Sequence, residues 1–303
     1  MGRSLKGIIT KGIGGFYYVD TAEGFSEERV YECRARGLFR KDKLKPLPGD
    51  TALIEVSGEL TGTVTDIIDR KNYLKRPPVA NIDCLVIVSS VASPAANTLI
   101  TDRLTALAAS RDIETAVVIS KSDLDGACAA ELADIYKKAG MEAFAVSIFS
   151  EESLSDFRAF FQKGKLYAFA GNTGVGKSSL LNRLDPGLRL PTGEISEKLG
   201  RGKHTTRQVE IFRFLSSYVA DTPGFSSFEL EKNGVILKED LADCFIEFRE
   251  HISGCKFSGC SHTNDRGCKV REAVEQGQIP ESRHKSYVTM YEEVKDVREW
   301  EIK

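Results

Sequence analysis

The chain has 303 residues, and 42 Lys and Arg side chains against 44 Asp and Glu give it a formal net charge of −2. Its hydrophobic content of 41% is ordinary for a soluble globular protein, and its length suggests about two domains. The charge excludes a uniformly basic nucleic-acid binder, and no apolar run approaches the roughly 18 residues needed to span a bilayer. Seven cysteines, an odd number, without an apolar signal segment predict a protein of the reducing cytosol.

Residues 1–72 are predicted to form short strands that are separated by glycines. The expected strands are 7–10, 16–19, 29–33, 51–56 and 62–68. Five strands at this spacing favour a small barrel, and OB barrels commonly bind nucleic acid. Basic side chains crowd one segment of this barrel: Arg34, Arg36, Arg40, Lys41, Lys43 and Lys45. Such a patch suits phosphate contacts even at low net charge, and a solvated charged loop is the alternative.

After residues 76–78 the pattern changes to alternating strands and helices, which is typical of a parallel α/β sheet. Further strands are expected at 84–88, 116–119, 166–170 and 217–220. Residues 235–303 are predicted to be mainly helical around a cysteine-rich loop, and the helical part is expected to include the charged run 291–299.

The expected strand at 116–119 leads into a polar tetrapeptide, Ser120-Lys121-Ser122-Asp123, which resembles the N-K-x-D motif of GTPases. In that family the Asp accepts hydrogen bonds from guanine N1 and N2, and the Lys stem packs along the base. Ser120 stands where Asn is expected, so one bracing hydrogen bond is expected to be lost. Ser147 is a candidate for the next guanine-loop residue, with Ile148 in place of the usual Ala. An ordinary polar loop is the alternative.

The expected strand at 166–170 is followed by residues 171–178, G-N-T-G-V-G-K-S, which match the phosphate loop G-x-x-x-x-G-K-[ST]. The glycines let backbone N–H groups surround an anion, and the following helix adds the positive end of its dipole. Lys177 is expected to reach the β- and γ-phosphates, and Ser178 to hold Mg²⁺. The expected nucleotide contacts in this segment are Gly171, Asn172, Thr173, Gly174, Val175, Gly176, Lys177, Ser178 and Ser179.

The strand at 217–220 is followed by Asp221-Thr222-Pro223-Gly224, which resembles the D-x-x-G motif of GTPases. Asp221 is expected to orient a Mg²⁺-bound water, and the Gly224 N–H to face the γ-phosphate. Between this motif and the phosphate loop, Thr206 is favoured as the switch threonine, with Thr205 as the alternative. A second group of basic side chains surrounds the two threonines: Lys198, Arg201, Lys203, His204 and Arg207.

The order of these motifs is that of a circular permutation. An ordinary GTPase has the phosphate loop first and the N-K-x-D motif later, whereas here the tetrapeptide at 120–123 precedes the loop at 171–178. In open α/β sheets the binding loops lie together at the carboxyl ends of the strands, so moving the chain break preserves the site. The D-x-x-G motif then leads directly into the C-terminal region. A change in the motif when the γ-phosphate is lost can therefore move that region through the backbone.

Three thiols and one imidazole lie within fourteen positions near the C-terminus, in the pattern Cys255-x4-Cys260-x-His262-x5-Cys268. Three Cys and one His make a closed tetrahedral zinc site, and four protein ligands leave no open position for catalysis. The pattern therefore predicts one structural zinc ion. Free buried cysteines beside a surface histidine are the alternative, which the tight spacing and the intervening glycines disfavour.

Together these features resemble the RsgA (YjeQ) family, the bacterial small-ribosomal-subunit biogenesis GTPases. The resemblance covers essentially the whole chain and includes residues 14–19, 33–37, 48–50, 70–72 and 76–81. It implies a multidomain α/β protein with three parts: an N-terminal OB-fold at 1–72, a circularly permuted P-loop GTPase domain at 73–230, and a mainly helical zinc-binding domain at 231–303. It also implies a cytoplasmic monomer that binds the 30S subunit and its 16S rRNA, assists late maturation, and hydrolyses GTP to GDP and phosphate with stimulation by the subunit.

The residue that positions the attacking water is not evident from the motifs. Many GTPases use Gln directly after D-x-x-G, but here that position holds Phe225, and no His lies between 205 and 250. We therefore expect slow intrinsic hydrolysis, with the missing group supplied or positioned by the ribosome. Two alternatives stay open: a nucleotide-switched RNA-binding assembly factor with negligible turnover, and an ATPase if Ser120 relaxes the base pocket.

Overall fold

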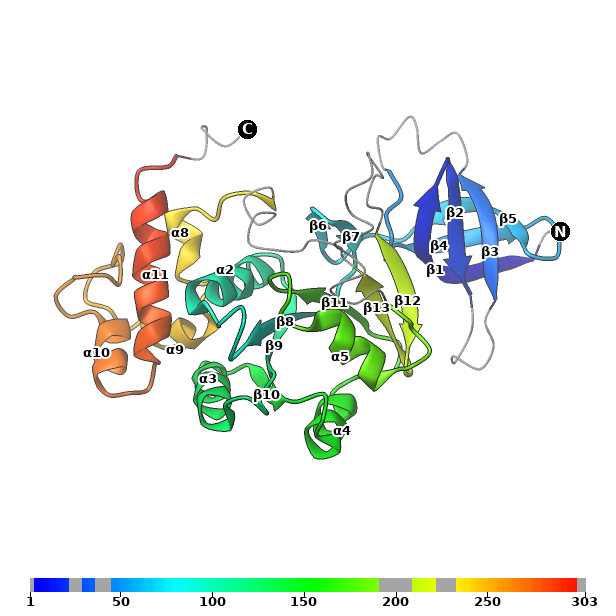
Figure 1. The fold of residues 1–303 in the computed structure, drawn as a ribbon. Helices are drawn as coiled ribbons and strands as arrows, with labels where there is room; N and C mark the ends of the chain where they lie inside the picture. The colour runs from blue at the N-terminus through cyan, green and yellow to red at the C-terminus, as the bar shows by residue number, and fades with distance from the viewer. Residues whose placement is uncertain (1–2, 22–28, 36–44, 191–208, 222–232, 299–303) are drawn as a thin grey trace, which may run out of the picture. The chain divides into compact units, whose positions relative to one another are not determined.

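The computed structural model describes most of the chain, and its compact parts fall into two units (Figure 1). The described residues are 3–21, 29–35, 45–190, 209–221 and 233–298. The first unit takes residues 1–84, 161–169 and 194–223, and the second takes 85–160, 170–193 and 224–303. Each unit therefore combines segments that are far apart in the sequence. The three-domain division at 1–72, 73–230 and 231–303 stays a prediction.

The first unit begins with a closed five-stranded barrel, drawn in blue in Figure 1. Its strands are β1 (Ser4–Ile13), β2 (Phe16–Asp20), β3 (Val30–Ala35), β4 (Thr51–Val56) and β5 (Thr61–Ile67). They are ordered β1-β2-β3-β5-β4, and β3 runs parallel to β5 while the other pairs are antiparallel. This closed five-stranded barrel confirms the predicted OB-fold. All five strands lie where the sequence placed them, although β1 is longer than expected.

The interior of the barrel is filled by alternate residues of its strands. Ile9, Val19, Tyr31, Ile54 and Val64 are all buried. Because successive side chains of a strand point to opposite faces, the intervening residues face solvent or neighbouring elements. This alternation explains why short strands with mixed apolar and polar residues close into a stable barrel.

The remaining strands of the first unit form two small groups. A hairpin of β6 (Tyr73–Lys75) and β7 (Pro78–Ala80) follows the barrel and was not expected from the sequence. The other group is β11 (Leu166–Ala170), β12 (Glu210–Phe214) and β13 (Ser217–Asp221). In it β11 pairs parallel to β13, and β12 and β13 form an antiparallel hairpin. The phosphate loop begins where β11 ends, and the D-x-x-G motif begins with the last residue of β13.

The second unit contains three neighbouring strands and four helices, each of which follows a strand in the chain. The strands are β8 (Cys84–Ser90), β9 (Glu114–Ser120) and β10 (Glu142–Val146), in the order β10-β9-β8. The helices are α2 (Thr98–Ala109), α3 (Gly126–Lys138), α4 (Glu151–Ala159) and α5 (Lys177–Leu184). Asn97, Asp125 and Ser150 cap α2, α3 and α4 by accepting a backbone N–H, which satisfies donors that a helix start leaves unpaired. The predicted alternation of strands and helices is confirmed.

Short helices around a cysteine-rich loop form the C-terminal part of the second unit. They are α8 (Lys238–Leu241), the 3-10 turn η3 (Ile246–Phe248), α9 (Arg249–Ile252), α10 (Lys269–Glu275) and α11 (Glu281–Val294). Phe245, Phe248 and Tyr287 pack in their common core. The expected helix through 291–299 is wrong at 295–298, because Val294 is the last residue of α11 that packs against this core, and residue 299 lies outside the described residues.

A buried ion network joins α11 to α2. Arg283 is completely buried and donates to Asp102 Oδ1 at 2.7 Å, to Thr105 Oγ1 at 2.8 Å and to Glu247 Oε1 at 2.6 Å. A buried guanidinium is stable only when its charge is paired and its donors are bonded, and two carboxylates do both here. In the part of the chain that the structure describes, no helix combines the length and apolarity required to cross a bilayer.

Candidate functional site

The phosphate-loop motif adopts the strand–loop–helix arrangement that the sequence predicts. Residues 171–176 connect β11 to α5, and Gly176 precedes the first helical residue, Lys177. The first turn of α5 carries no acidic side chain, so the positive end of the helix dipole is not neutralised there. The helix start thus provides backbone N–H donors and positive potential for an anion.

Two glycines of this loop are required by its geometry. Gly171 has φ +139°, and a Cβ at this position would lie 2.1 Å from Val88 O, so any side chain would collide with β8. Gly176 has φ +95°, a left-handed conformation that L-residues avoid. The loop therefore follows a tight path that glycine permits at these two positions, and glycine-rich loops of this kind present backbone N–H groups to anions.

The lysine of the motif lies against its own loop. Lys177 Nζ donates to Gly171 O at 2.7 Å and to Asn172 O at 2.9 Å. These bonds hold a positive charge at the loop that is expected to receive phosphates. Ser178, the predicted Mg²⁺ ligand, follows in the first turn of α5 and is half-buried.

Ser120, the first residue of the predicted base motif, connects two strands of the site. It ends β9, is 6% exposed, and its Oγ lies 2.8 Å from Ser89 O and 2.6 Å from Val175 O. A serine hydroxyl has one proton, so it donates to only one of these carbonyls at a time. Serine therefore still ties the base motif to the phosphate loop, with one donor for two acceptors.

Lys121 extends across the base motif to the loop after β8. It adopts φ +58°, and its Nζ donates to Ala92 O at 3.1 Å and Ser93 O at 2.7 Å. Both ends of the side chain are thus fixed, and its methylene stem lies between them. This is the arrangement that a flat apolar wall for a base requires.

Asp123 is positioned by a residue from the following strand–helix loop. Ser147 Oγ donates to Asp123 Oδ1 at 2.6 Å, and Ser147 is itself buried. One hydrogen bond leaves this carboxylate able to accept more, since each of its oxygens has two lone pairs. The structure thus brings the suspected guanine-loop residue Ser147 against the predicted base-reading carboxylate.

The base motif and the phosphate loop line one cavity of about 270 Å³. Its described lining residues are Ser120, Lys121, Asp123, Leu124, Val146, Ile148, Phe149, Val175, Gly176, Ser179 and Leu180. Polar groups of two separate motifs therefore meet across an apolar hollow, which is the usual construction of a small-ligand site. Sequence reasoning missed Leu124 and Phe149, because isolated apolar residues in loops carry no periodic signal.

The switch residues are only partly within the described structure. Asp221 is the last residue of β13, where its backbone pairs with Glu210 of β12. Thr205, Thr206 and Gly224 lie outside the described residues, as do the basic residues near them at 198–207. Their roles stay predictions.

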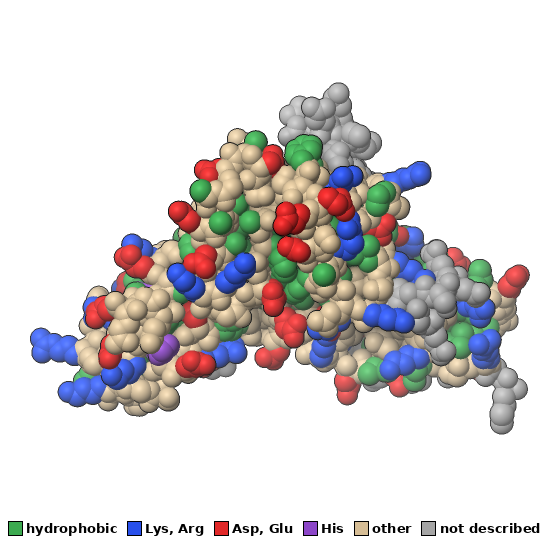
Figure 2. Space-filling model, turned by 90° about the horizontal axis from the view of Figure 1, so that it is seen from below, with side chains coloured by type: hydrophobic (Ala, Val, Ile, Leu, Met, Phe, Trp, Pro, Cys, Tyr) green, Lys and Arg blue, Asp and Glu red, His purple; other side chains and the backbone are tan. Residues whose placement is uncertain are grey.

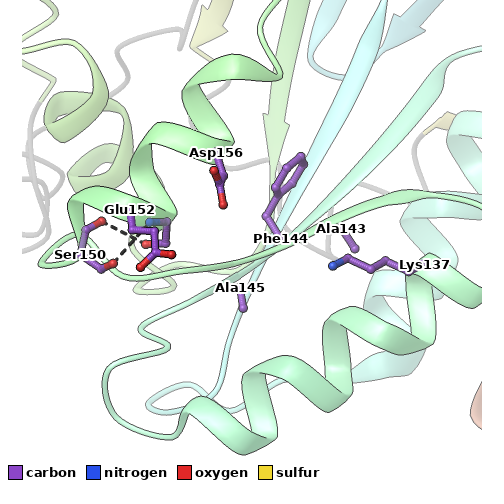
Figure 3. A pocket seen from close by; sticks show the side chains of 8 residues that line it. Lys137, Ala143, Phe144, Ala145, Ser150, Glu152 and Asp156 are labelled. Atoms are coloured by element: carbon purple, nitrogen blue, oxygen red, sulfur yellow. Dashed lines mark hydrogen bonds between the residues drawn. The ribbon is translucent and has the colours of Figure 1, made fainter.

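A second hollow, of about 290 Å³, lies between α3, β10 and α4 (Figure 3). Lys137, Phe144, Glu152 and Asp156 line it, together with Ala143, Ala145, Ser150 and Ser153. None of these residues belongs to a motif that the sequence singles out. The hollow combines an ammonium and two carboxylates around one phenyl ring, and it holds no convergent set of donors for phosphate.

The four predicted metal ligands come together in the C-terminal loop. The ligand atoms of Cys255, Cys260, His262 and Cys268 all lie within 4.8 Å of one another. His262 Nδ1 lies 3.6 Å from Cys255 Sγ and 3.5 Å from Cys268 Sγ. Four donors of this kind around one point form a site that could hold a metal ion, and they fit a tetrahedral zinc ion with no open position.

The surroundings of this cluster fit a cation. Burial raises the pKa of the Cys260 thiol to about 12 and lowers the pKa of His262. A thiol with a raised pKa becomes a thiolate ligand only beside a positive charge, which a divalent metal provides, and a neutral imidazole is the form that ligates. Backbone N–H groups of Lys269 and Arg271 point at Cys255 Sγ and Cys268 Sγ, at 3.3 and 3.5 Å, and would stabilise the thiolates.

On the face seen in Figure 2, the charged side chains are distributed rather than concentrated. Figure 2 shows Lys and Arg interspersed with Asp and Glu over the face in view. Of the predicted barrel patch, Arg34 and Lys45 are described, and the Arg34 guanidinium lies 4.8 Å from the centre of the Phe16 ring. The other members, Arg36, Arg40, Lys41 and Lys43, lie outside the described residues.

Comparison with known proteins places this arrangement in a family. A model of the RsgA GTPase matches residues 67–231, and a model of the RsgA N-terminal domain matches residues 6–64. The chain is 43% identical to the small ribosomal subunit biogenesis GTPase RsgA of Caldanaerobacter subterraneus, with 96% of both chains covered. It is also 43% identical to the protein of that name from Geobacillus kaustophilus, with 96% of this chain and 98% of the relative covered.

Two solved structures share the fold over nearly the whole chain. YloQ, a circularly permuted GTPase, superposes with a TM-score of 0.81 at 36% identity, covering 98% of this chain and 96% of that one. YjeQ from Thermotoga maritima superposes with a TM-score of 0.83 at 33% identity, covering 98% and 100%. The predicted circular permutation is confirmed by these matches. The chain belongs to the RsgA family of GTPases.

Proposed function

We propose that this chain hydrolyses GTP to GDP and phosphate while it assists late maturation of the small ribosomal subunit. The observation that carries the proposal is the cavity in which Asp123 of the base motif and Gly176 of the phosphate loop meet. Such a cavity accommodates one ligand that has both a base and a phosphate chain. The names of the relatives, which are small ribosomal subunit biogenesis GTPases, support the choice of ribosomal partner.

The residue roles follow from their places in the site. Asp123 reads the donor edge of guanine, and Lys121 lies along the base. Ser120 holds the motif against the phosphate loop, and the Ser122 N–H holds it against β10 by donating to Val146 O. Residues 171–179 surround the phosphates with backbone N–H groups, and Lys177 neutralises the β- and γ-phosphate charge. Ser178 and Asp221 would hold a Mg²⁺ ion, which supplies Lewis-acid stabilisation of the transferring phosphoryl group when bound. Thr206, or Thr205, and Gly224 would sense the γ-phosphate.

The motifs contain no evident residue that positions the attacking water. Phe225 occupies the position where many GTPases have Gln, and its side chain cannot bond to water. Positioning and charge neutralisation account for most of the catalysis in phosphoryl transfer, so an unpositioned water means slow hydrolysis. We therefore expect the chain alone to be a slow GTPase, and the subunit to supply or position the missing group.

The other parts of the chain serve binding and structure. A closed four-ligand zinc site at Cys255, Cys260, His262 and Cys268 would organise the C-terminal loop, and it has no catalytic position. The OB barrel would contact 16S rRNA, because OB folds commonly bind oligonucleotides and basic residues neutralise phosphates. The protein would act in the cytoplasm as a monomer. The domain at 1–72 would then bind RNA, the domain at 73–230 would carry out catalysis, and the domain at 231–303 would depend on zinc for its structure.

Single-turnover hydrolysis of GTP tests this function. The rate is measured with the chain alone, with purified 30S subunits, and with 50S subunits as a matched control. We expect slow hydrolysis alone and a marked acceleration only with 30S subunits, and competition by GTP but not by ATP. Tight 30S binding without any acceleration would instead support a nucleotide-switched binding factor with negligible turnover.

A further inference from the structure

Two large apolar side chains stand out from the protein surface at the nucleotide cavity. Phe149 is 79% exposed and Leu124 is 63% exposed, and both line the hollow that Asp123 also lines. Among the described lining residues, Phe149 is the one aromatic side chain. Exposed apolar side chains that adjoin convergent polar groups indicate a surface that a ligand covers.

The loop that carries Phe149 is held by several hydrogen bonds. The Phe149 N–H donates to Ser147 Oγ at 3.1 Å, and the Ser150 N–H donates to Ser147 O at 3.1 Å, which closes a turn. Ser150 then caps α4, and Arg183 Nε of α5 donates to Ile148 O at 3.2 Å. The backbone of Phe149 is thus fixed on both sides while its ring extends from the surface.

The same hydroxyl bonds both the Phe149 backbone and the Asp123 carboxylate. Ser147 Oγ accepts from the Phe149 N–H and donates to Asp123 Oδ1 at 2.6 Å. One side chain therefore positions both the carboxylate of the base motif and the backbone from which the Phe149 ring extends. Lys121, whose amino group is bonded to Ala92 O and Ser93 O, contributes a fixed aliphatic surface to the same cavity.

We propose that Phe149 is a stacking wall for the purine ring of the bound guanine nucleotide. This inference rests on the proposed GTP-binding function and assigns a residue outside the motifs. Every base has a π-face, so stacking on an aromatic ring adds affinity without regard to base identity. Phe149 then supplies affinity for the face of the base, and Asp123 supplies selectivity for its edge.

The test is isothermal titration of Phe149→Ala with GDP, GTP and IDP, whose base lacks the guanine 2-amino group. We expect all three dissociation constants to rise together by about tenfold, so that the GDP/IDP ratio is unchanged. Phe257→Ala is the matched control, because Phe257 is also an exposed phenylalanine, at 52%, and does not line this cavity. It should leave all three constants unchanged.

A fluorescence measurement gives an independent readout. The chain has one tryptophan, Trp300, so Phe149→Trp in a Trp300→Phe background carries a single indole at the proposed wall. We expect this variant to bind GDP within about threefold of wild type, and its emission to be quenched when GDP stacks on the indole. Unquenched emission at saturating GDP, or wild-type GDP affinity in Phe149→Ala, would overturn the stacking role.

Asp123→Asn separates this inference from the proposed function. If Asp123→Asn transfers preference from GDP to XDP while Phe149→Ala binds GDP normally, the base site is right and only the Phe149 wall is wrong. If Asp123→Asn keeps the guanine preference, residues 120–123 are not the base motif, and both the proposed nucleotide site and the wall are wrong.

Discussion

Arg213 donates two hydrogen bonds to Asp20, from Nε to Oδ2 at 2.7 Å and from Nη2 to Oδ1 at 2.8 Å. The Tyr218 hydroxyl adds a third, to Oδ2 at 3.1 Å. Asp20 is the last residue of β2 in the barrel, whereas Arg213 and Tyr218 belong to the β12–β13 hairpin, which ends at Asp221. A buried carboxylate therefore fastens the barrel to the hairpin from which the D-x-x-G motif emerges.

Asp20→Ala should lower the free energy of unfolding by about 3 kcal/mol, because it removes the buried carboxylate that accepts from both the Arg213 guanidinium and the Tyr218 hydroxyl. Urea denaturation measures the loss. Glu210→Ala is the matched control, since it breaks the Lys11–Glu210 pair of 2.8 Å between the same barrel and hairpin. Both side chains of that pair are partly exposed to solvent, so its loss should cost at most about 1 kcal/mol. Equal losses in the two variants would contradict a special role for Asp20.

Lys177→Ala should weaken GTP binding by more than about tenfold, because a charge-assisted hydrogen bond to phosphate is lost. The fold should be retained, since the side chain bonds to carbonyls of its own loop. Binding of a fluorescent GTP analogue and the circular dichroism spectrum check both points. Lys163→Ala, in an exposed turn, is the control. Normal binding by Lys177→Ala would show that the phosphate-loop assignment is wrong.

Ser120→Asn should tighten GDP and GTP together by a modest factor, within the roughly 0.5–1.5 kcal/mol of a net hydrogen bond. An amide has two N–H donors, and Ser120 faces two carbonyls, Ser89 O and Val175 O, with one proton. Ser120→Ala should weaken both nucleotides, because neither carbonyl then has this donor. Calorimetry compares the GDP affinities of the wild type, Ser120→Asn and Ser120→Ala. Thermal unfolding shows whether the larger Asn side chain fits at this position. Weaker binding by Ser120→Asn at unchanged stability would contradict the two-donor argument.

Cys260→Ala should release about one equivalent of zinc and destabilise the C-terminal helices, since a structural zinc site contributes roughly 10–16 kcal/mol of apparent binding free energy in isolated finger peptides. Cys128→Ala is the control, because Cys128 lies in α3 outside the cluster. Cysteine ligands must lose their protons, so zinc should also be lost from the wild type as the pH is lowered. Elemental analysis of freshly purified protein decides the matter, and wild-type protein without zinc would refute the assignment.

The sequence predicted those elements whose local pattern and tertiary environment agree. Strands 51–56 and 166–170 match β4 and β11 to the residue, because each is a run of strand-forming residues ended by a turn or loop. The clustering of Cys255, Cys260, His262 and Cys268 was predicted correctly, because three Cys and one His at this spacing are typical of a metal site. The end of α11 was misplaced, since charged residues continue the helical pattern after the core that supports the helix has ended.

Residues that act through distant partners gave no local signal. Arg283 stands in a polar stretch that is typical of an exposed helix, and the partners that allow its burial, Asp102, Thr105 and Glu247, are far away in the sequence. In the sequence Phe149 is an isolated apolar residue before α4. Its proposed role in nucleotide binding follows from its position next to Ser147 and Asp123 in the structure. Sequence patterns report faces of single elements, whereas these residues are defined by contacts between elements.

The buried Arg283 network has a consequence for cooperativity. Helix α11 also reaches the cysteine cluster, where Tyr287 donates to Ser261 O at 2.8 Å and His284 Nε2 lies 2.8 Å from His262 O. Helix α11 therefore contacts the cysteine-rich loop through Tyr287 and His284, and it contacts α2 through Arg283. The amides of α2 and α11 should exchange with deuterium as one cooperative block, so that loosening the cysteine loop accelerates exchange in a helix that contains none of its ligands.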